Sequence, residues 1–261
     1  MPDGSFHGFE AGGIFVKTEA VDPGSQIEIF YGLLKPETVC ENVYVTEDGD
    51  FDFYNFERTS NGRAVVLRRD FLHASPYIDV ARIDNLILIT RGPLIPAISQ
   101  LTLEQAVALM ILGQSMESSA GDPTQAGRIK SEFFYDPFVA GNRAEHANIF
   151  YEILRRLPHM NYYLLNTGGV GEGERYKDIR LEYSMAILDS LLRGGLEDWI
   201  GSPTGFKVPR AIRHVDDIYL HPEKLYSRIE FEGKQEELNK VRRGAIEKLD
   251  RTLHPEIRNV F

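Results

Sequence analysis

The chain has 261 residues, a formal net charge of −10 and one cysteine, Cys40. This length is sufficient for one large domain or two small ones with a substantial core. The acidic balance excludes the broad basic surface that nucleic-acid binding needs, although a local basic pocket can still hold a small anion. A single cysteine excludes an intramolecular disulfide framework and is typical of a reducing compartment. No apolar run reaches the ~18 residues of a membrane span and no signal-peptide pattern opens the chain, so we predict a cytoplasmic protein without a membrane partner.

The first third of the chain is predicted to form short elements separated by turns. Residues 14–19 are short enough for either a strand or a helical turn. The β-branched run at residues 39–45 predicts one strand, and the sequence Glu-Asp-Gly-Asp at residues 47–50 is typical of a hairpin turn. We therefore expect a β-hairpin over residues 43–54.

Capping signals predict two helices in the middle of the chain. Thr102 and Gln105 have capping-box spacing, and the helix that they open ends near Gly113. Asn142 precedes a second amphipathic run, which a proline closes. Upstream, residues 86–90 (LILIT) predict a buried strand. Near the C-terminus we expect a loop over residues 203–210 and a charged helix over residues 235–253.

The most informative stretch is residues 162–192. An apolar run at 162–165 predicts a buried strand, a loop with four glycines follows, and apolar residues at helical spacing then predict an amphipathic helix. A strand, a glycine-rich loop and a helix in this order present backbone N–H groups to an anion or nucleotide, but the same glycines can serve only as a turn. Because helices and buried strands interleave, the predicted fold class is α/β, with a mixed sheet flanked by helices.

Several segments, taken in order, resemble the ATP-dependent phosphoenolpyruvate carboxykinase family, and together they extend over essentially the whole chain. The segments are Phe9-Glu10-Ala11-Gly12-Gly13 with Lys17-Thr18, Cys40-Glu41-Asn42-Val43, Asn61-Gly62-Arg63-Ala64, residues 85–90 with Leu101-Thr102 and Glu104-Gln105-Ala106, Leu165-Asn166-Thr167-Gly168, and Gly205-Phe206-Lys207-Val208-Pro209. The resemblance implies the C-terminal portion of that family's nucleotide-binding fold, as a single domain over residues 1–261 that is incomplete on its N-terminal side.

The resemblance also implies two catalytic residues, Arg63 and Lys17. Arg63 matches an arginine that touches the transferred phosphoryl group, where a guanidinium can neutralise the equatorial oxygens bidentately. Lys17 is implied to face the cleft between nucleotide and substrate. The alternatives are an ordinary surface lysine at position 17 and an Arg63 that pairs with Glu57 or Asp70.

Four further residues are implied to contact the nucleotide. Gln26 matches a position near the sugar and Ser184 a position near the adenine. Asn166 and Gly168 belong to the loop that the resemblance places along the nucleotide. Asp178 departs from the family, because it stands where an arginine is expected beside the adenine.

No metal site is predicted in this chain. It contains neither a G-x-x-x-x-G-K-[ST] phosphate loop nor the family's acidic metal motif. The cluster of His214, Asp216, Asp217 and His221 matches no standard ligand spacing, and we expect a solvated loop there. Cys40 lies in an apolar strand pattern, which favours a buried structural cysteine over a nucleophile.

Two classes of function stay open. The first is a phosphotransferase portion of a carboxykinase, which in the complete family enzyme converts oxaloacetate and ATP to phosphoenolpyruvate, ADP and CO2 with Mg²⁺ and Mn²⁺. The chain would then bind a nucleotide and a small carboxylate, would be inactive alone, and would need an upstream segment or a separate polypeptide for the missing half. The second is a non-catalytic nucleotide-binding or regulatory relative, which Asp178 favours. A kinase of this fold with another acceptor lies between them.

Overall fold

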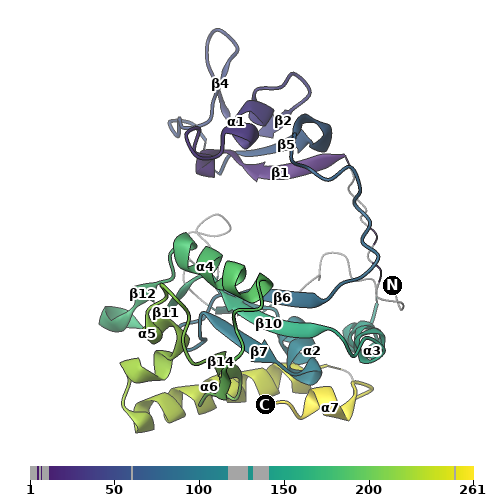
Figure 1. The fold of residues 1–261 in the computed structure, drawn as a ribbon, viewed down its shortest axis with the longest axis vertical. Helices are drawn as coiled ribbons and strands as arrows, with labels where there is room; N and C mark the ends of the chain where they lie inside the picture. Colours follow the sequence, from purple (N-terminus) through teal and green to yellow (C-terminus); the bar gives the residue numbers. More distant parts are fainter. Residues whose placement is uncertain are drawn as a thin grey trace. The chain divides into compact units, whose positions relative to one another are not determined.

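The computed structural model describes Ser5, His7 and residues 12–59, 61–116, 129–131, 141–249 and 251–261. Contacts divide the chain into two compact units, residues 5–82 and residues 83–261, which are described in turn (Figure 1). The sequence prediction treats residues 1–261 as one domain. No helix within the described residues is long and apolar enough to cross a membrane.

Residues 5–82 contain a sheet of three described strands with one helix against it. β1 (Gly13–Lys17) and β2 (Val39–Glu41) both pair antiparallel with the central strand β5 (Arg63–Leu67). The helix α1 (Ile27–Leu33) packs on the face that carries Val66, where a Cβ on Gly32 would lie 2.8 Å from Val66 Cγ1. The helix therefore approaches the strand this closely because position 32 is a glycine.

The β-branched run that predicts one strand forms two. Asn42 adopts a left-handed conformation with φ of 54°, and this bend separates β2 from β3 (Tyr44–Val45). β3 then pairs antiparallel with β4 (Phe51–Asp52), so the predicted hairpin is confirmed.

Residues 83–261 are built on a mixed sheet whose five described strands lie in the order β13–β14–β7–β10–β6. β10 pairs in parallel with β6 and antiparallel with β7, and both predicted strands are present. β10 is buried as predicted, but the predicted burial of β6 is wrong, because β6 is the edge strand of the described sheet and Ile89 is 70% exposed. The predicted loop at residues 203–210 is wrong at residues 207–209, where β14 joins this sheet and buries Val208 completely. The bounds are β6 (Asn85–Thr90), β7 (Ile98–Leu101), β10 (Asn161–Asn166), β13 (Trp199–Gly201) and β14 (Lys207–Pro209).

Helices cover both faces of this sheet, which makes the unit an α/β structure as predicted (Figure 1). Side chains of β10 alternate between the faces: Tyr163 and Leu165 pack with α4 (Leu181–Leu192), and Leu164 packs with the helices opposite. Those opposite helices are α2 (Leu103–Leu112), α3 (Arg143–Arg155), α6 (Arg228–Glu247) and α7 (Pro255–Arg258).

The predicted helix caps are present. Thr102 and Gln105 form the capping box of α2, Gly113 ends that helix in a left-handed conformation, and the Asn142 side chain accepts from two backbone N–H groups at the start of α3. The predicted helix over residues 235–253 instead spans Arg228–Glu247, because the Ser227 side chain caps it earlier.

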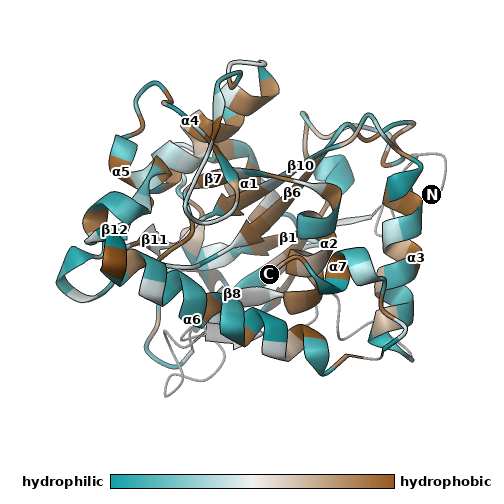
Figure 2. Cartoon of the chain, turned by 90° about the horizontal axis from the view of Figure 1, so that it is seen from below, coloured by the Kyte–Doolittle hydropathy of each residue, from teal (hydrophilic) through white to brown (hydrophobic). Residues whose placement is uncertain are grey.

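The helix α6 presents mostly hydrophilic residues on the side seen in Figure 2, whereas β6 and β10 are mostly hydrophobic. One of its charged residues, Arg242, is nevertheless fully buried, with its guanidinium carbon 4.6 Å from the centre of the Phe261 ring and 5.8 Å from that of Phe206. Burial lowers the pKa of Arg242 to about 10. The aromatic faces partly offset this desolvation and fix the end of the chain against α6.

The remaining elements are short. They are η1 (Thr18–Ala20), η2 (Arg68–Asp70), β8 (Gln114–Met116), β9 (Ile129–Ser131), β11 (Gly169–Val170), η4 (Gly173–Arg175), β12 (Lys177–Asp178), α5 (Asp217–Leu220) and η5 (Pro222–Leu225).

Because α4 packs on the sheet, a cavity between this helix and the sheet should destabilise residues 83–261. Replacing Ile187, which is 0% exposed in the core beneath α4, with alanine should lower the free energy of unfolding by about 2–5 kcal/mol. Trp199, the only tryptophan, packs against the same core, so its fluorescence during a urea titration reports this unit. Met185→Ala on the same helix, where the side chain is 56% exposed, should change that free energy by less than about 0.5 kcal/mol. Equal losses in both variants would contradict this packing.

Candidate functional site

The two predicted catalytic residues lie side by side in residues 5–82. Lys17 ends β1 and Arg63 begins β5, and the two are directly opposite each other in the antiparallel register. Directly opposite residues in such a pair have Cβ atoms about 4.5–5.5 Å apart. Both side chains are exposed, and together with Asn61 and Phe15 they line a hollow of about 320 Å³. The structure thus places two cations at one surface depression.

The two cations differ in their surroundings. Lys17 Nζ lies 2.8 Å from Glu19 Oε1, and Glu19 Oε2 also accepts a hydrogen bond of 3.2 Å from the backbone N–H of Gly62. The hydrogen bond from Lys17 holds the pKa of Glu19 below its usual value. Arg63 forms no ion pair with an acidic side chain among the described residues, which leaves its guanidinium available to a ligand in this hollow. The alternative in which Glu57 or Asp70 holds Arg63 is therefore not what the structure shows.

Gln26 belongs to the same unit but does not line the hollow. It precedes α1, and its Oε1 accepts a 2.9 Å hydrogen bond from the backbone N–H of Asp22. This contact closes the turn before the helix. The side chain is exposed, and its predicted contact with a nucleotide sugar stays a prediction.

Asn166 ends β10 in residues 83–261 and is completely buried. Its Nδ2 lies within hydrogen-bond distance of three carbonyl oxygens, those of Gly92 (2.9 Å), Ile95 (2.7 Å) and Gly169 (3.1 Å). Its Oδ1 accepts a 3.0 Å hydrogen bond from the N–H of Gly168. An amide has two N–H donors, so one of them is shared between two carbonyls and the side chain is fully used inside the protein. Asn166 thus joins the loop after β6 to the loop after β10.

Gly168 and Ser184 lie in this same unit. The Gly168 carbonyl accepts a 2.8 Å hydrogen bond from Ile179 N, and a Cβ at position 168 would lie 3.1 Å from Arg91 Cβ. The glycine therefore lets the loop pass close to Arg91. Ser184 is buried in α4. Asp178, which stands where the resemblance implies an arginine, is exposed on β12 opposite Gly169.

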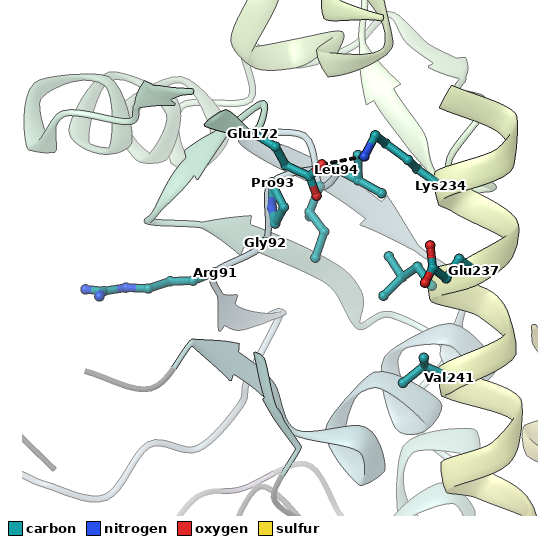
Figure 3. Close-up of a pocket in the computed structure, with 10 residues that line it drawn as sticks. Arg91, Gly92, Pro93, Leu94, Glu172, Lys234, Glu237 and Val241 are labelled. Atoms are coloured by element: carbon teal, nitrogen blue, oxygen red, sulfur yellow. Dashed lines mark hydrogen bonds and ion pairs between the residues drawn. The ribbon is translucent and has the colours of Figure 1, made fainter. Parts of the chain in front are cut away.

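A second hollow, of about 370 Å³, lies at the carboxyl ends of β6 and β10 (Figure 3). Because these strands are parallel, the loops after them meet at one edge of the sheet, the usual place for a ligand in such folds. Leu94 and Ile95 form a buried apolar wall, and α6 supplies the opposite side with Leu238 and Val241. Lys234 on α6 forms a 2.6 Å ion pair with Glu172, which raises the pKa of Lys234, whereas Arg91 extends away from the other labelled residues (Figure 3).

The sequence predicted neither this second hollow nor four of the residues that line the first hollow, which are Phe15, Val16, Asn61 and Ala64. The second hollow depends on the packing of α6 against a loop far upstream, for which no local sequence pattern exists. Phe15 had a usable signal, because it stands two residues before Lys17 in a strand and therefore shares its face. Asn61 lines the hollow with a left-handed backbone, φ of 61°.

No group of three or more His, Cys, Asp or Glu side chains in the described ranges has an arrangement that could hold a metal ion. In the predicted His and Asp cluster, Asp216 instead caps α5, and Lys224 pairs with Asp217. The expectation of a solvated loop is wrong for His221, which is buried with Nδ1 3.3 Å from a Glu223 oxygen. Cys40 is half-buried on β2, and burial raises the pKa of its thiol.

Comparison with known proteins identifies the family. Residues 1–218 match the family described as phosphoenolpyruvate carboxykinase. The phosphoenolpyruvate carboxykinase (ATP) of Aeropyrum pernix is 31% identical over 85% of this chain and 44% of its own length. The enzymes of the same name from Wigglesworthia glossinidia brevipalpis and Allorhizobium ampelinum are 29% and 28% identical, each over 86% of this chain and over 42% and 43% of their own lengths.

The chain thus spans less than half the length of these relatives. The match extends through both units, since residues 1–218 include the strands of Lys17 and Arg63 as well as the Asn166 loop. The chain therefore belongs to the ATP-dependent phosphoenolpyruvate carboxykinase family.

Proposed function

We propose that this chain forms part of an ATP-dependent phosphoenolpyruvate carboxykinase and that Lys17 and Arg63 bind the phosphate groups of ATP in it. The observation that supports this most directly is the pairing of the two cations across β1 and β5 at one hollow. Two relatives with the same printed name are 31% and 29% identical to this chain over the aligned residues. Metal-assisted phosphoryl transfer depends mainly on positioning and on cations that neutralise the phosphate oxygens, which are the roles these residues can fill.

The reaction in question joins a decarboxylation to a phosphoryl transfer. The C–C bond of oxaloacetate breaks to release CO2, and its electron pair forms the enolate of pyruvate. The enolate oxygen then bonds to the γ-phosphorus of ATP while the bond to the ADP oxygen breaks. Arg63 would hold the transferred group through two N–H donors, and Lys17 would act as a point charge on a neighbouring phosphate oxygen.

The described residues fit the phosphates of ATP better than they fit a divalent metal. Two exposed cations face one hollow, whereas no cluster of metal-ligating side chains occurs in the described part of the chain. We therefore assign Lys17 and Arg63 to binding and orienting phosphates and assign no residue here to Mg²⁺ or Mn²⁺. The 261 residues are expected to bind ATP without turning it over alone.

In residues 83–261, considered by themselves, the loop after β10 has features that suit contact with a nucleotide. Gly168 would offer a close backbone approach, Ser184 a hydroxyl on α4, and Asn166 would act as a positioning residue that fixes the loop. A nucleotide-binding relative without carboxykinase chemistry is the second candidate, and the exposed Asp178 favours it. A coupled assay for phosphoenolpyruvate, with the chain mixed with the remaining portion of a relative, distinguishes the two: product formation supports the first, and ATP binding without product supports the second.

Removal of either cation should weaken ATP binding. Lys17→Ala and Arg63→Ala should each raise the Kd for Mg-ATP, measured by calorimetry with the 261-residue chain at fixed salt, by about ten-fold or more, because hydrogen bonds to charged groups contribute roughly 1.5–3 kcal/mol. Arg69→Ala is the matched control, since Arg69 is exposed in the same unit and lies 3.5 Å from Glu37 outside the hollow. An unchanged Kd in both variants would overturn the assignment.

Release of Lys17 from its acidic neighbour should have the opposite effect. Glu19→Gln removes the charge that competes for Lys17 but retains a carbonyl oxygen for Gly62 N–H. At pH 7 the affinity for ATP should rise about two- to five-fold, the scale of an exposed ion pair. The pKa of Glu19 is lowered, so at neutral pH its carboxylate is charged and paired with Lys17. The ion pair is lost only as the pH falls through that lowered pKa, so the gain in ATP affinity is expected at neutral pH. Weaker binding in this variant would show that Glu19 assists the ligand rather than competing with it.

Loss of the Asn166 side chain should loosen both loops that it joins. Asn166→Ala leaves buried carbonyl groups without their donor and should lower the free energy of unfolding by about 2–4 kcal/mol, followed by Trp199 fluorescence in urea. Amide hydrogen exchange at Gly168 should also accelerate, since its acceptor is gone. Asn161→Ala, at the exposed start of the same strand, serves as the control and should change neither readout appreciably.

A further inference from the structure

The sheet of residues 5–82 has one packed face and one open face. Ala64 and Val66 point into the core with Leu33 and Val21, and α1 covers them. The residues that alternate with Ala64 and Val66, and those beside them on the neighbouring strands, lie on the open face of the sheet. Their exposure follows this alternation, since Phe15 is 71% and Val39 68% exposed.

The strand register arranges the open face in rows. One row holds Lys17, Arg63 and Glu41, because Arg63 is opposite Lys17 on one side and Glu41 on the other. The next row holds Phe15, Val65 and Val39 in the same order. Adjacent rows on one face are two residues apart along a strand, which is about 7 Å. A row of charges therefore lies beside an apolar row.

Phe15 belongs to the same hollow as the two cations. The lining of that hollow includes Phe15, Lys17 and Arg63 but not Val39 at the far end of the apolar row. An anion held by the cations thus has an exposed aromatic ring about 7 Å away along β1. This separation suits a molecule with phosphate at one end and an organic body at the other.

We propose that Phe15 binds the ribose or base of the nucleotide whose phosphates lie on Lys17 and Arg63, so that this hollow selects nucleotides over inorganic polyphosphate. The inference rests on the proposed function and adds the residue that distinguishes the organic part of the ligand. An aromatic face contacts a sugar or base without regard to sequence or hydrogen-bonding pattern, so Phe15 contributes affinity rather than a choice between bases.

Two ligands separate the aromatic contact from the phosphate contact. ATP and inorganic tripolyphosphate, each with Mg²⁺, are titrated into the 261-residue chain and its variants by calorimetry. Phe15→Ala should raise the Kd for ATP about ten-fold, the scale of one stacking contact, and leave the Kd for tripolyphosphate unchanged. Phe15→Tyr should retain ATP binding, because the ring is kept. Val39→Ala is the matched control from the same row and should alter neither Kd.

The outcomes of this experiment are distinct. An unchanged Kd for ATP in Phe15→Ala, or an equal loss for both ligands, would overturn the role of Phe15 and leave the cations untouched. If Lys17→Ala and Arg63→Ala leave the Kd of both ligands unchanged, the proposed phosphate site itself is wrong. If Val39→Ala weakens ATP binding as much as Phe15→Ala does, the whole apolar row contributes nonspecifically to binding, and a specific contact of the Phe15 ring is excluded. Unchanged far-UV circular dichroism and thermal midpoints show that each variant folds.

Discussion

The parallel pairing of β6 with β10 determines where the candidate nucleotide loop lies in residues 83–261. Six residues of each strand are in register, so both strands end at the same edge of the sheet and their loops must share that edge. Each loop contains backbone carbonyls that burial would leave without a donor. The side chain of Asn166, the last residue of β10, supplies donors to carbonyls of both loops. The shape of the candidate nucleotide loop therefore depends on one buried amide.

In residues 5–82 the corresponding constraint is the antiparallel register of β1 and β5. Thr18 N donates to Gly62 O at 3.0 Å, and Glu19 accepts from Gly62 N, so the end of β1 and the start of β5 are held together from both sides. A Cβ at Gly62 would collide with the Thr18 hydroxyl, which explains why glycine occupies this position. A slip of one residue would turn Lys17 or Arg63 to the packed face, so the cation pair exists only in this register.

Local signals in the sequence predict much of this fold. Thr102, Gln105 and Asn142 specify helix starts through their own hydrogen bonds, and the apolar runs of β6 and β10 specify strands, because these patterns depend on neighbours in the chain. β14 was missed for the opposite reason, whereas the early start of α6 had a local signal in the Ser227 cap. The strand Lys207–Pro209 is short and exists because it pairs with β7 and β13, and these partners are remote in sequence.

The residues of the candidate site can also be divided into those that the sequence predicts and those that only the structure shows. Lys17 and Arg63 follow from matched segments of a known family, and the structure adds the register that makes them neighbours. The hydrogen bonds of Asn166 to Gly92 and Ile95 were beyond prediction, since they join positions more than 70 residues apart. The division of the described chain into two units also has no local signal, because no low-complexity linker marks it.

The electrostatics of the first hollow explain why an organic contact matters there. The net charge of −10 has little effect on a ligand in this hollow, because exposed charges are screened beyond about 8 Å at physiological salt. Closer in, the two cations have two acidic neighbours: Glu19 in contact with Lys17, and Glu41 opposite Arg63 in the register. A phosphate group must therefore compete with Glu19 for Lys17, and the surplus positive charge comes mainly from Arg63, whose guanidinium forms no ion pair with an acidic side chain in the described part of the chain. Charge alone then gives modest affinity for any polyphosphate, and the exposed Phe15 ring beside the cations would add a contact in residues 5–82 that favours a nucleotide.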